Sequence, residues 1–235
     1  MTWRGLLLIA AWAAVTLDTP SSAQTDLDLL GVTDPLLEPD TLGVVLDPGL
    51  EGVRLAMENG EYASAASELS DFLLLRTGHV QALRLLASCY LHLDDLEQSI
   101  QASLQVAAED TLDTGILSSL GYLYHRSGDL DNASLYYRLA EEKAPLQPYS
   151  RFGRAWIYVS RRDFETAHEL ATRITELAPD FAENYLLLGR VLTAKGLYRE
   201  AARSYRHAFR LDPELRTSYG VLLQELTLRH GVTRR

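Results

Sequence analysis

The chain has 235 residues, of which 47% are apolar and 23% are charged, and its formal net charge is −10. An acidic chain of this kind is not expected to bind nucleic acid, because such proteins cluster Lys and Arg on one face. The single cysteine excludes an intramolecular disulfide, and a chain of this length can bury a sufficient apolar core without one.

Residues 1–23 have the layout of a secretory signal peptide. Arg4 provides a positive start, residues 5–15 form an apolar run, and small side chains lead up to Ala23. The run is about half as long as a helix that spans a bilayer. We therefore expect cleavage near Ala23, a secreted or periplasmic protein, and no stable membrane span in the mature chain. Retention of this segment as an anchor is the alternative.

Residues 24–48 form a predicted acidic linker. An acidic residue precedes proline three times, at Asp34-Pro35, Glu38-Pro39 and Asp47-Pro48. Proline lacks a backbone donor and disfavours helix in the residue before it, so we expect no regular helix here. Leucine and valine are also frequent in this segment. It therefore either covers the first repeat as an apolar cap or forms a disordered tether.

From residue 49 onward the chain repeats itself every 34 residues. A turn residue recurs at Gly60, Asp94, Gly128, Arg162 and Gly196. Two positions later comes a large apolar residue, at Tyr62, Leu96, Leu130, Phe164 and Tyr198. Three positions further on comes a small residue, at Ala65, Ser99, Ala133, Ala167 and Ala201. A period of this length predicts stacked helical hairpins, because one hairpin cannot bury its apolar face alone.

The third unit shows how one hairpin is built. Its first helix carries residues at three- and four-residue spacing, namely Leu117, Leu120, Gly121 and Tyr124. After a turn at Gly128, the second helix carries Leu130, Ala133, Tyr137 and Ala140. Pro145 ends this helix, since proline cannot continue the hydrogen-bond ladder. The small residues Gly121 and Ala133 predict a close approach of the two helices.

This pattern resembles the tetratricopeptide repeat over about residues 46–214, in five units that share one register. The fifth unit carries the family's signature at Leu188, Gly189, Leu192, Gly196, Tyr198, Ala201, Tyr205, Ala208 and Pro213. The resemblance implies an all-α, right-handed superhelical solenoid of antiparallel helix pairs. We expect five repeats over residues 49–214, a capping helix over 215–229 and a tail over 230–235.

The fourth unit departs from the family. It keeps Phe164, Ala167 and Pro179, but it places Arg151 and Arg154 where the family has large apolar residues. The first unit is also irregular, because Val53 replaces the small residue that the family has in the first helix.

Signatures of catalysis are missing from the sequence. His168-Glu169 begins like a zinc-protease helix, but Thr172 stands where the second histidine is required. Asp129 and Asp131 lack the rest of a calcium loop and are expected to cap the following helix. We therefore predict a protein that is not an enzyme and that has no cofactor or metal site.

The resemblance implies a concave groove lined by the first helices of successive units. The residues that would contact a partner there are Arg84, His92, Tyr122, His125, Arg126, Tyr149, Phe152, Trp156, Leu186 and Arg190. Aromatic residues flanked by arginine are favoured at binding hot spots. The alternative is that Phe152 and Trp156 are core residues of a fourth unit whose register has slipped.

The predicted function is that of a non-catalytic, exported scaffold or adaptor. It would bind a peptide or helix of a partner protein in its groove and support assembly of a bacterial envelope complex, such as a pilus, secretion, outer-membrane or cytochrome system. Charge suggests an alternative, because residues 24–80 have a net charge of −9 whereas residues 148–235 have +5. Acidic N-terminal repeats would then dock on basic C-terminal repeats of another copy, as a self-assembling structural module. An accessory subunit of an enzyme encoded elsewhere is a third hypothesis.

Overall fold

The computed structural model of the chain describes residues 47–110 and 113–231. The predicted signal peptide and almost all of the predicted linker lie outside these ranges. The described part contains a short 3-10 helix, η2 (Pro48–Leu50), and eleven α-helices. These are α4 (Glu51–Glu58), α5 (Tyr62–Leu75), α6 (Val80–His92), α7 (Leu96–Glu109), α8 (Thr114–Arg126), α9 (Leu130–Lys143), α10 (Pro148–Ser160), α11 (Phe164–Leu177), α12 (Ala182–Ala194), α13 (Tyr198–Leu211) and α14 (Leu215–His230).

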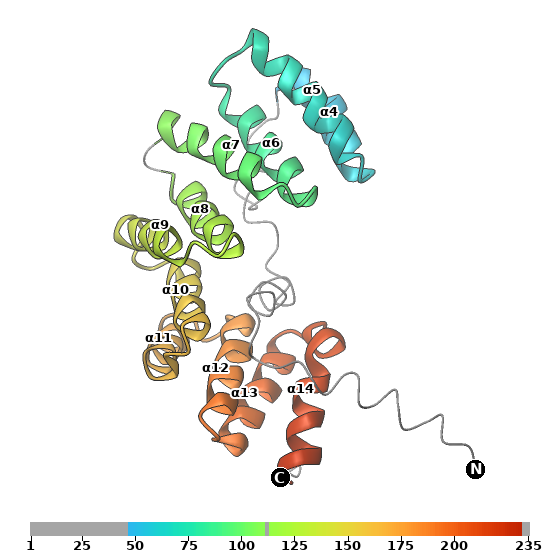
Figure 1. The fold of residues 1–235 in the computed structure, drawn as a ribbon. Coiled ribbons are helices and arrows are strands. Elements are labelled where there is room, and N and C mark those ends of the chain that lie inside the picture. Colours follow the sequence, from blue (N-terminus) through green and yellow to red (C-terminus); the bar gives the residue numbers. More distant parts are fainter. Residues whose placement is uncertain (1–46, 111–112, 232–235) are drawn as a thin grey trace, which may run out of the picture. The chain divides into compact units, whose positions relative to one another are not determined.

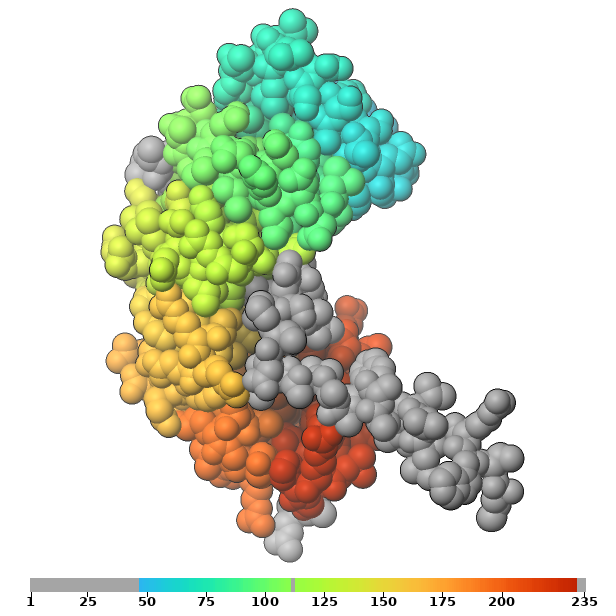
Figure 2. All heavy atoms as spheres, viewed as in Figure 1, coloured from blue at the N-terminus to red at the C-terminus, as the bar shows by residue number. Residues whose placement is uncertain are grey.

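The helices form five hairpins and a final single helix. Within each hairpin the two helices pack on each other, and each hairpin packs on the next along the chain (Figure 1). In the space-filling view, α10 and α11 lie between the third and the fifth units (Figure 2). The predicted all-α solenoid of antiparallel helix pairs is confirmed, and α14 packs on α13 at its end. Within the described ranges, every helix is too short or too polar to cross a bilayer.

The 34-residue turn position has a common backbone conformation. All five residues at this position have positive φ, at Gly60, Asp94, Gly128, Arg162 and Gly196. Glycine reaches this left-handed region without steric cost, whereas other residues reach it with strain. The first helix therefore stops at the same place in every unit, and the chain reverses into the second helix.

Aspartates cap the helices that follow several of these turns. The carboxylates of Asp95, Asp129 and Asp163 each accept a hydrogen bond from the backbone N–H three residues later. These bonds satisfy amide donors that the helix itself leaves without a partner. The expected cap at Asp129 is thus present. Asp131 does not cap the helix, because its carboxylate pairs with Arg161 of the next unit at 2.6 Å.

The third and fourth units meet around the ring of Tyr137. A Cβ atom added to Gly121 of α8 would lie 2.6 Å from this ring, and one added to Gly153 of α10 would lie 2.2 Å from its Cζ. One aromatic ring of α9 therefore fills the space that two glycines leave open on two first helices. The predicted close approach at Gly121 is explained by this ring, and Gly189 faces Tyr205 in the same way in the fifth unit.

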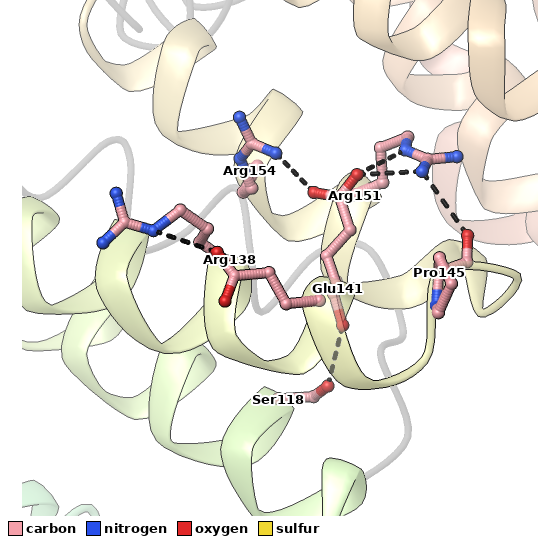
Figure 3. Close-up of polar contacts among 8 residues, drawn as sticks. Ser118, Arg138, Glu141, Pro145, Arg151 and Arg154 are labelled. Carbon is pink, nitrogen blue, oxygen red and sulfur yellow. Dashed lines mark hydrogen bonds and ion pairs between the residues drawn. The ribbon is translucent and has the colours of Figure 1, made fainter.

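Arg151 and Arg154, which break the apolar rule of the fourth unit, both bind Glu141. Figure 3 shows the two guanidinium groups of α10 on either side of this carboxylate of α9. Arg151 Nη2 lies 2.8 Å from Glu141 Oε1 and also donates to the backbone carbonyl of Pro145 at 3.4 Å. Burial alone would raise the pKa of the Glu141 carboxyl, but hydrogen bonds and charge from both arginines lower it overall. The units therefore join here through a largely buried ion cluster in place of apolar packing.

The first unit is shortened at its start. Its opening helix α4 has 8 residues, whereas α6, α8, α10 and α12 have 13 each. Pro48 begins a 3-10 turn before it, and Asp47 caps this turn by accepting a hydrogen bond from the backbone N–H of Gly49. Val53 of α4 is nevertheless fully buried, so the short helix still packs as part of the first hairpin.

Gly153→Ala should destabilise the fold by about 1–3 kcal/mol, since the new methyl group would overlap the Tyr137 ring. Urea unfolding followed by circular dichroism measures this change. In a Tyr137→Leu background the same substitution should cost less, because the ring is gone. Gly220→Ala in α14 is the matched control: its nearest neighbour would lie at 3.7 Å, and alanine should stabilise the helix by up to about 1 kcal/mol. Equal effects at both glycines would contradict this packing.

Glu141→Ala should destabilise the fold by about 1–3 kcal/mol, because two largely buried guanidinium groups lose their carboxylate partner. The adjacent Glu142 is a matched control, since it pairs with Arg138 on the exposed surface at 3.8 Å. Glu142→Ala should cost less than about 0.5 kcal/mol. Denaturant midpoints of the two variants at equal ionic strength provide the comparison. The cluster is unimportant to stability if the two midpoints agree.

Candidate functional site

The ten residues predicted to bind a partner lie on α6, α8, α10 and α12, the first helices of units two to five. We call the sides of these helices that carry the ten residues the first-helix face. The helix α10 packs directly on both α8 and α12, so this face is continuous across the third, fourth and fifth units.

Aromatic rings gather on this face where the fourth unit meets the fifth. Phe152 and Trp156 meet edge to face with ring centroids 6.5 Å apart, and Tyr149 and Phe152 each lie 5.1 Å from the ring of Phe181. Such pairs add about 0.5–1.5 kcal/mol beyond their buried area. We call Tyr149, Phe152, Trp156 and Phe181 the aromatic cluster.

Exposure differs strongly within the aromatic cluster. Tyr149 is 45% exposed, whereas Phe152 is 5% and Trp156 2% exposed. Leu186 of α12 is also buried. A partner that approaches this face would therefore meet Tyr149 first, while the other rings support it from beneath.

Arg190 places a positive charge against the aromatic cluster. Its guanidinium carbon lies 5.4 Å from the centroid of the Trp156 ring, which is within the range of a cation–π interaction. The structure thus brings together four of the predicted residues: Tyr149, Phe152, Trp156 and Arg190.

The three predicted residues of α8 form a second group. The guanidinium of Arg126 lies 6.0 Å from the Tyr122 ring and pairs with the Asp94 carboxylate, in the turn of the second unit, at 2.8 Å. His125 is buried, and its Nε2 lies 3.0 Å from Oγ of Ser160 in α10. These contacts connect neighbouring units, so this group has a structural role in addition to any role in binding.

The two predicted residues of α6 lie in separate contacts. Arg84 forms an ion pair with Asp113, the residue that caps α8, and both side chains are largely buried. His92 is exposed at the end of α6 and stacks on Tyr62 with ring centroids 4.1 Å apart. Arg84 and Arg126 are among the residues predicted to contact a partner. In this structure each of them holds a carboxylate of this chain.

Burial controls the charge of His125. It lowers the pKa of the imidazole from 6.5 to about 4, so the ring is neutral near pH 7. Its Nδ1 is buried and makes no hydrogen bond with the described residues. The same holds for the indole Nε1 of Trp156. Two polar atoms of the first-helix face thus lack partners within the described part of the chain, and each such atom costs about 1–3 kcal/mol.

The chemistry of the face suits binding. Aromatic and aliphatic side chains offer apolar contact, and Arg190 offers charge and donors for a carboxylate. No group of three His, Cys, Asp or Glu side chains within residues 47–110 and 113–231 is arranged to hold a metal ion.

Phe181 is the member of the aromatic cluster that the sequence analysis missed. It is the N-cap residue of α12 and makes no side-chain capping hydrogen bond. Helix N-caps are normally Ser, Thr, Asp or Asn, so an aromatic residue there was the available indication of a packing role.

Family models agree with the repeat structure. One model described as tetratricopeptide repeat matches residues 50–115 and 152–215, and a second with the same description matches residues 115–145. The chain therefore belongs to the tetratricopeptide repeat family. It is 24% identical over 189 residues to the CTR9 homolog of Arabidopsis thaliana, a match that covers 78% of this chain but only 16% of that protein.

Solved structures show the same fold. MamA has 18% sequence identity and a TM-score of 0.61, with 73% of this chain and 98% of that chain covered. A thermophilic tetratricopeptide repeat protein of Thermus thermophilus has 20% identity, a TM-score of 0.61 and coverage of 75% and 97%. YrrB, described as having an unusual peptide-binding site, has 15% identity, a TM-score of 0.55 and coverage of 74% and 90%. At these identities the likeness extends to the fold alone.

Acid should destabilise the fold through His125. Its folded-state pKa of about 4 lies below the unfolded value of 6.5, so the unfolded chain takes up the proton first as the pH falls. This contribution to stability is complete above pH 6.5 and is lost toward pH 4, by about 2–3 kcal/mol at pH 4.5. His125→Gln should reduce the difference in unfolding free energy between pH 7 and pH 4.5 by this amount. An unchanged difference in His125→Gln would contradict this prediction, because it would mean that the imidazole takes up its proton equally readily in the folded and the unfolded chain.

Proposed function

We propose that the protein is a non-catalytic adaptor that binds an extended peptide or a helix of a partner protein on its first-helix face. The observation that carries this proposal is the aromatic cluster, with Tyr149 exposed above buried rings and Arg190 against Trp156. Exposed aromatic residues supported by well-packed neighbours, with arginine alongside, are the usual composition of a binding hot spot.

The family supports a binding role. Stacked helical hairpins present extended surfaces that other proteins bind, and YrrB is a fold relative that is described as having a peptide-binding site. The ligand best suited to this face carries apolar side chains for the aromatic cluster and a carboxylate for Arg190.

We further propose that the protein acts outside the cytoplasm, in assembly of a bacterial envelope complex. The support is the signal-peptide layout of residues 1–23 in the sequence. The opposite net charges of the N-terminal and C-terminal repeats also fit self-association. Ligand binding measured over a range of protein concentrations separates binding of a partner from binding of a second copy.

Tyr149→Ala should weaken binding of ligand peptides by about tenfold or more, because it removes the exposed anchor of the aromatic cluster. Peptides are selected from a displayed random library on the intact protein, and their affinities are measured by fluorescence anisotropy. Thermal unfolding should change little, since Tyr149 is 45% exposed.

Leu146→Ala is the matched control. Leu146 lies three residues earlier and is 79% exposed, but it belongs to the connection before α10 and not to the first-helix face. This variant should bind the peptides as the parent does. Selected peptides that bind both variants equally well would place the binding surface elsewhere and refute the proposal.

A further inference from the structure

The described part of the chain begins on the first-helix face. The backbone N–H of Asp47 donates to Oε1 of Gln81 at 3.1 Å, and the Asp47 carboxylate pairs with Arg76 at 2.7 Å. Gln81 is the second residue of α6 and occupies the repeat position that Tyr149 occupies two periods later. Asp47, the first residue that the structure describes, therefore lies at this face.

Two buried atoms of the same face need partners from elsewhere. Trp156 Nε1 and His125 Nδ1 are buried and make no hydrogen bond within residues 47–110 and 113–231. The indole N–H is only a donor, so its partner must be an acceptor such as a backbone carbonyl. An extended chain segment lying on the face offers such carbonyls, because extended backbone makes no internal hydrogen bonds.

Residues 33–46 have the chemistry to occupy this face. They contain three acidic residues and no basic one, opposite in sign to the net +5 of residues 148–235. Leu36 and Leu37 stand between Pro35 and Glu38-Pro39. The two prolines favour extended backbone, which lowers the entropy that is lost on binding. This stretch therefore presents two apolar side chains flanked by carboxylates.

The length of chain fits as well. Leu37 precedes Asp47 by ten residues, which reach at most about 33–36 Å when extended. The aromatic cluster lies two units beyond Gln81. Packed helices are about 8–10 Å apart, so the four helix-to-helix steps from α6 to α10 amount to at most about 32–40 Å. The distance is shorter where first helices pack directly on each other, as α8 and α10 do. Leu36 and Leu37 can thus reach Tyr149 and Trp156 from the same molecule.

We propose that residues 33–46 bind in cis to the first-helix face, with Leu36 and Leu37 on the aromatic cluster. Backbone carbonyls of the segment accept the hydrogen bond of Trp156, and the Asp34 and Glu38 carboxylates face Arg190. This inference rests on the proposed function, because the segment occupies the surface assigned to the partner. It makes the N-terminal segment a built-in competitor that a partner must displace.

Tryptophan fluorescence tests this proposal directly. Trp3 and Trp12 are the only other tryptophans, so Trp3→Phe and Trp12→Phe in the full chain leave Trp156 as the sole emitter. Adding Leu36→Ser and Leu37→Ser should shift its emission to longer wavelength and raise the acrylamide quenching constant at least about twofold. A synthetic peptide of residues 30–46 should reverse both changes. Leu74→Ser with Leu75→Ser is the matched control on the exposed end of α5 and should leave both values unchanged.

The outcomes separate the two proposals. If the Leu36/Leu37 variant leaves Trp156 emission and quenching unchanged while selected peptides still need Tyr149, the cis contact is refuted and the proposed function stands. If Trp156 responds but no peptide binds, the cis contact stands and the proposed function fails. If both hold, the variant should bind selected peptides about tenfold more tightly. Changes in Trp156 emission on hundredfold dilution would refute binding in cis, because they would assign the segment to a second copy.

Discussion

Close approach of helices across a glycine is the constraint on which the stacking of this protein depends. Tyr137 of α9 occupies the space beside Gly121 and Gly153, so one ring sets the separation of two consecutive first helices. Tyr205 uses Gly189 in the same way within the fifth unit. A methyl group at these glycines would push the helices apart, because protein interiors have no spare volume to absorb it. The spacing of the first helices, which form the first-helix face, is therefore set by tyrosines of the second helices α9 and α13.

Charge joins the units where apolar packing is interrupted. Glu141 holds both arginines of α10, and on the turn side Arg161 pairs with Asp131 and Lys195 with Glu165. Lys195 lies 34 residues after Arg161, and Glu165 lies 34 residues after Asp131. These two ion pairs therefore recur with the period of the repeat, as the apolar residues do. Exposed pairs of this kind contribute little to stability. The largely buried Glu141 cluster matters more, since a missing partner there would leave charge buried.

Ion pairs within the chain also reduce the number of predicted residues that can bind a carboxylate of a partner. An arginine that already holds a carboxylate of its own chain has less to offer a partner, which applies to Arg84 and Arg126. The aromatic cluster, with the Arg190 guanidinium against the Trp156 ring, carries the proposed site. Trp156 connects the two proposals, since its ring belongs to the cluster and its buried Nε1 calls for an acceptor.

The amino-acid sequence by itself determined the repeat, the helix pairs and the places where each helix stops. These features are local: the left-handed turn at Gly128 and the cap at Asp129 each involve residues only a few positions apart in the sequence. Only the tertiary structure decided that Arg151 and Arg154 share Glu141, that Phe181 joins Tyr149 and Phe152, and that Arg84 pairs with Asp113. These contacts join side chains of different helices. The helical period predicts the face of the helix on which a residue lies, but it does not predict which side chain of another helix that residue contacts.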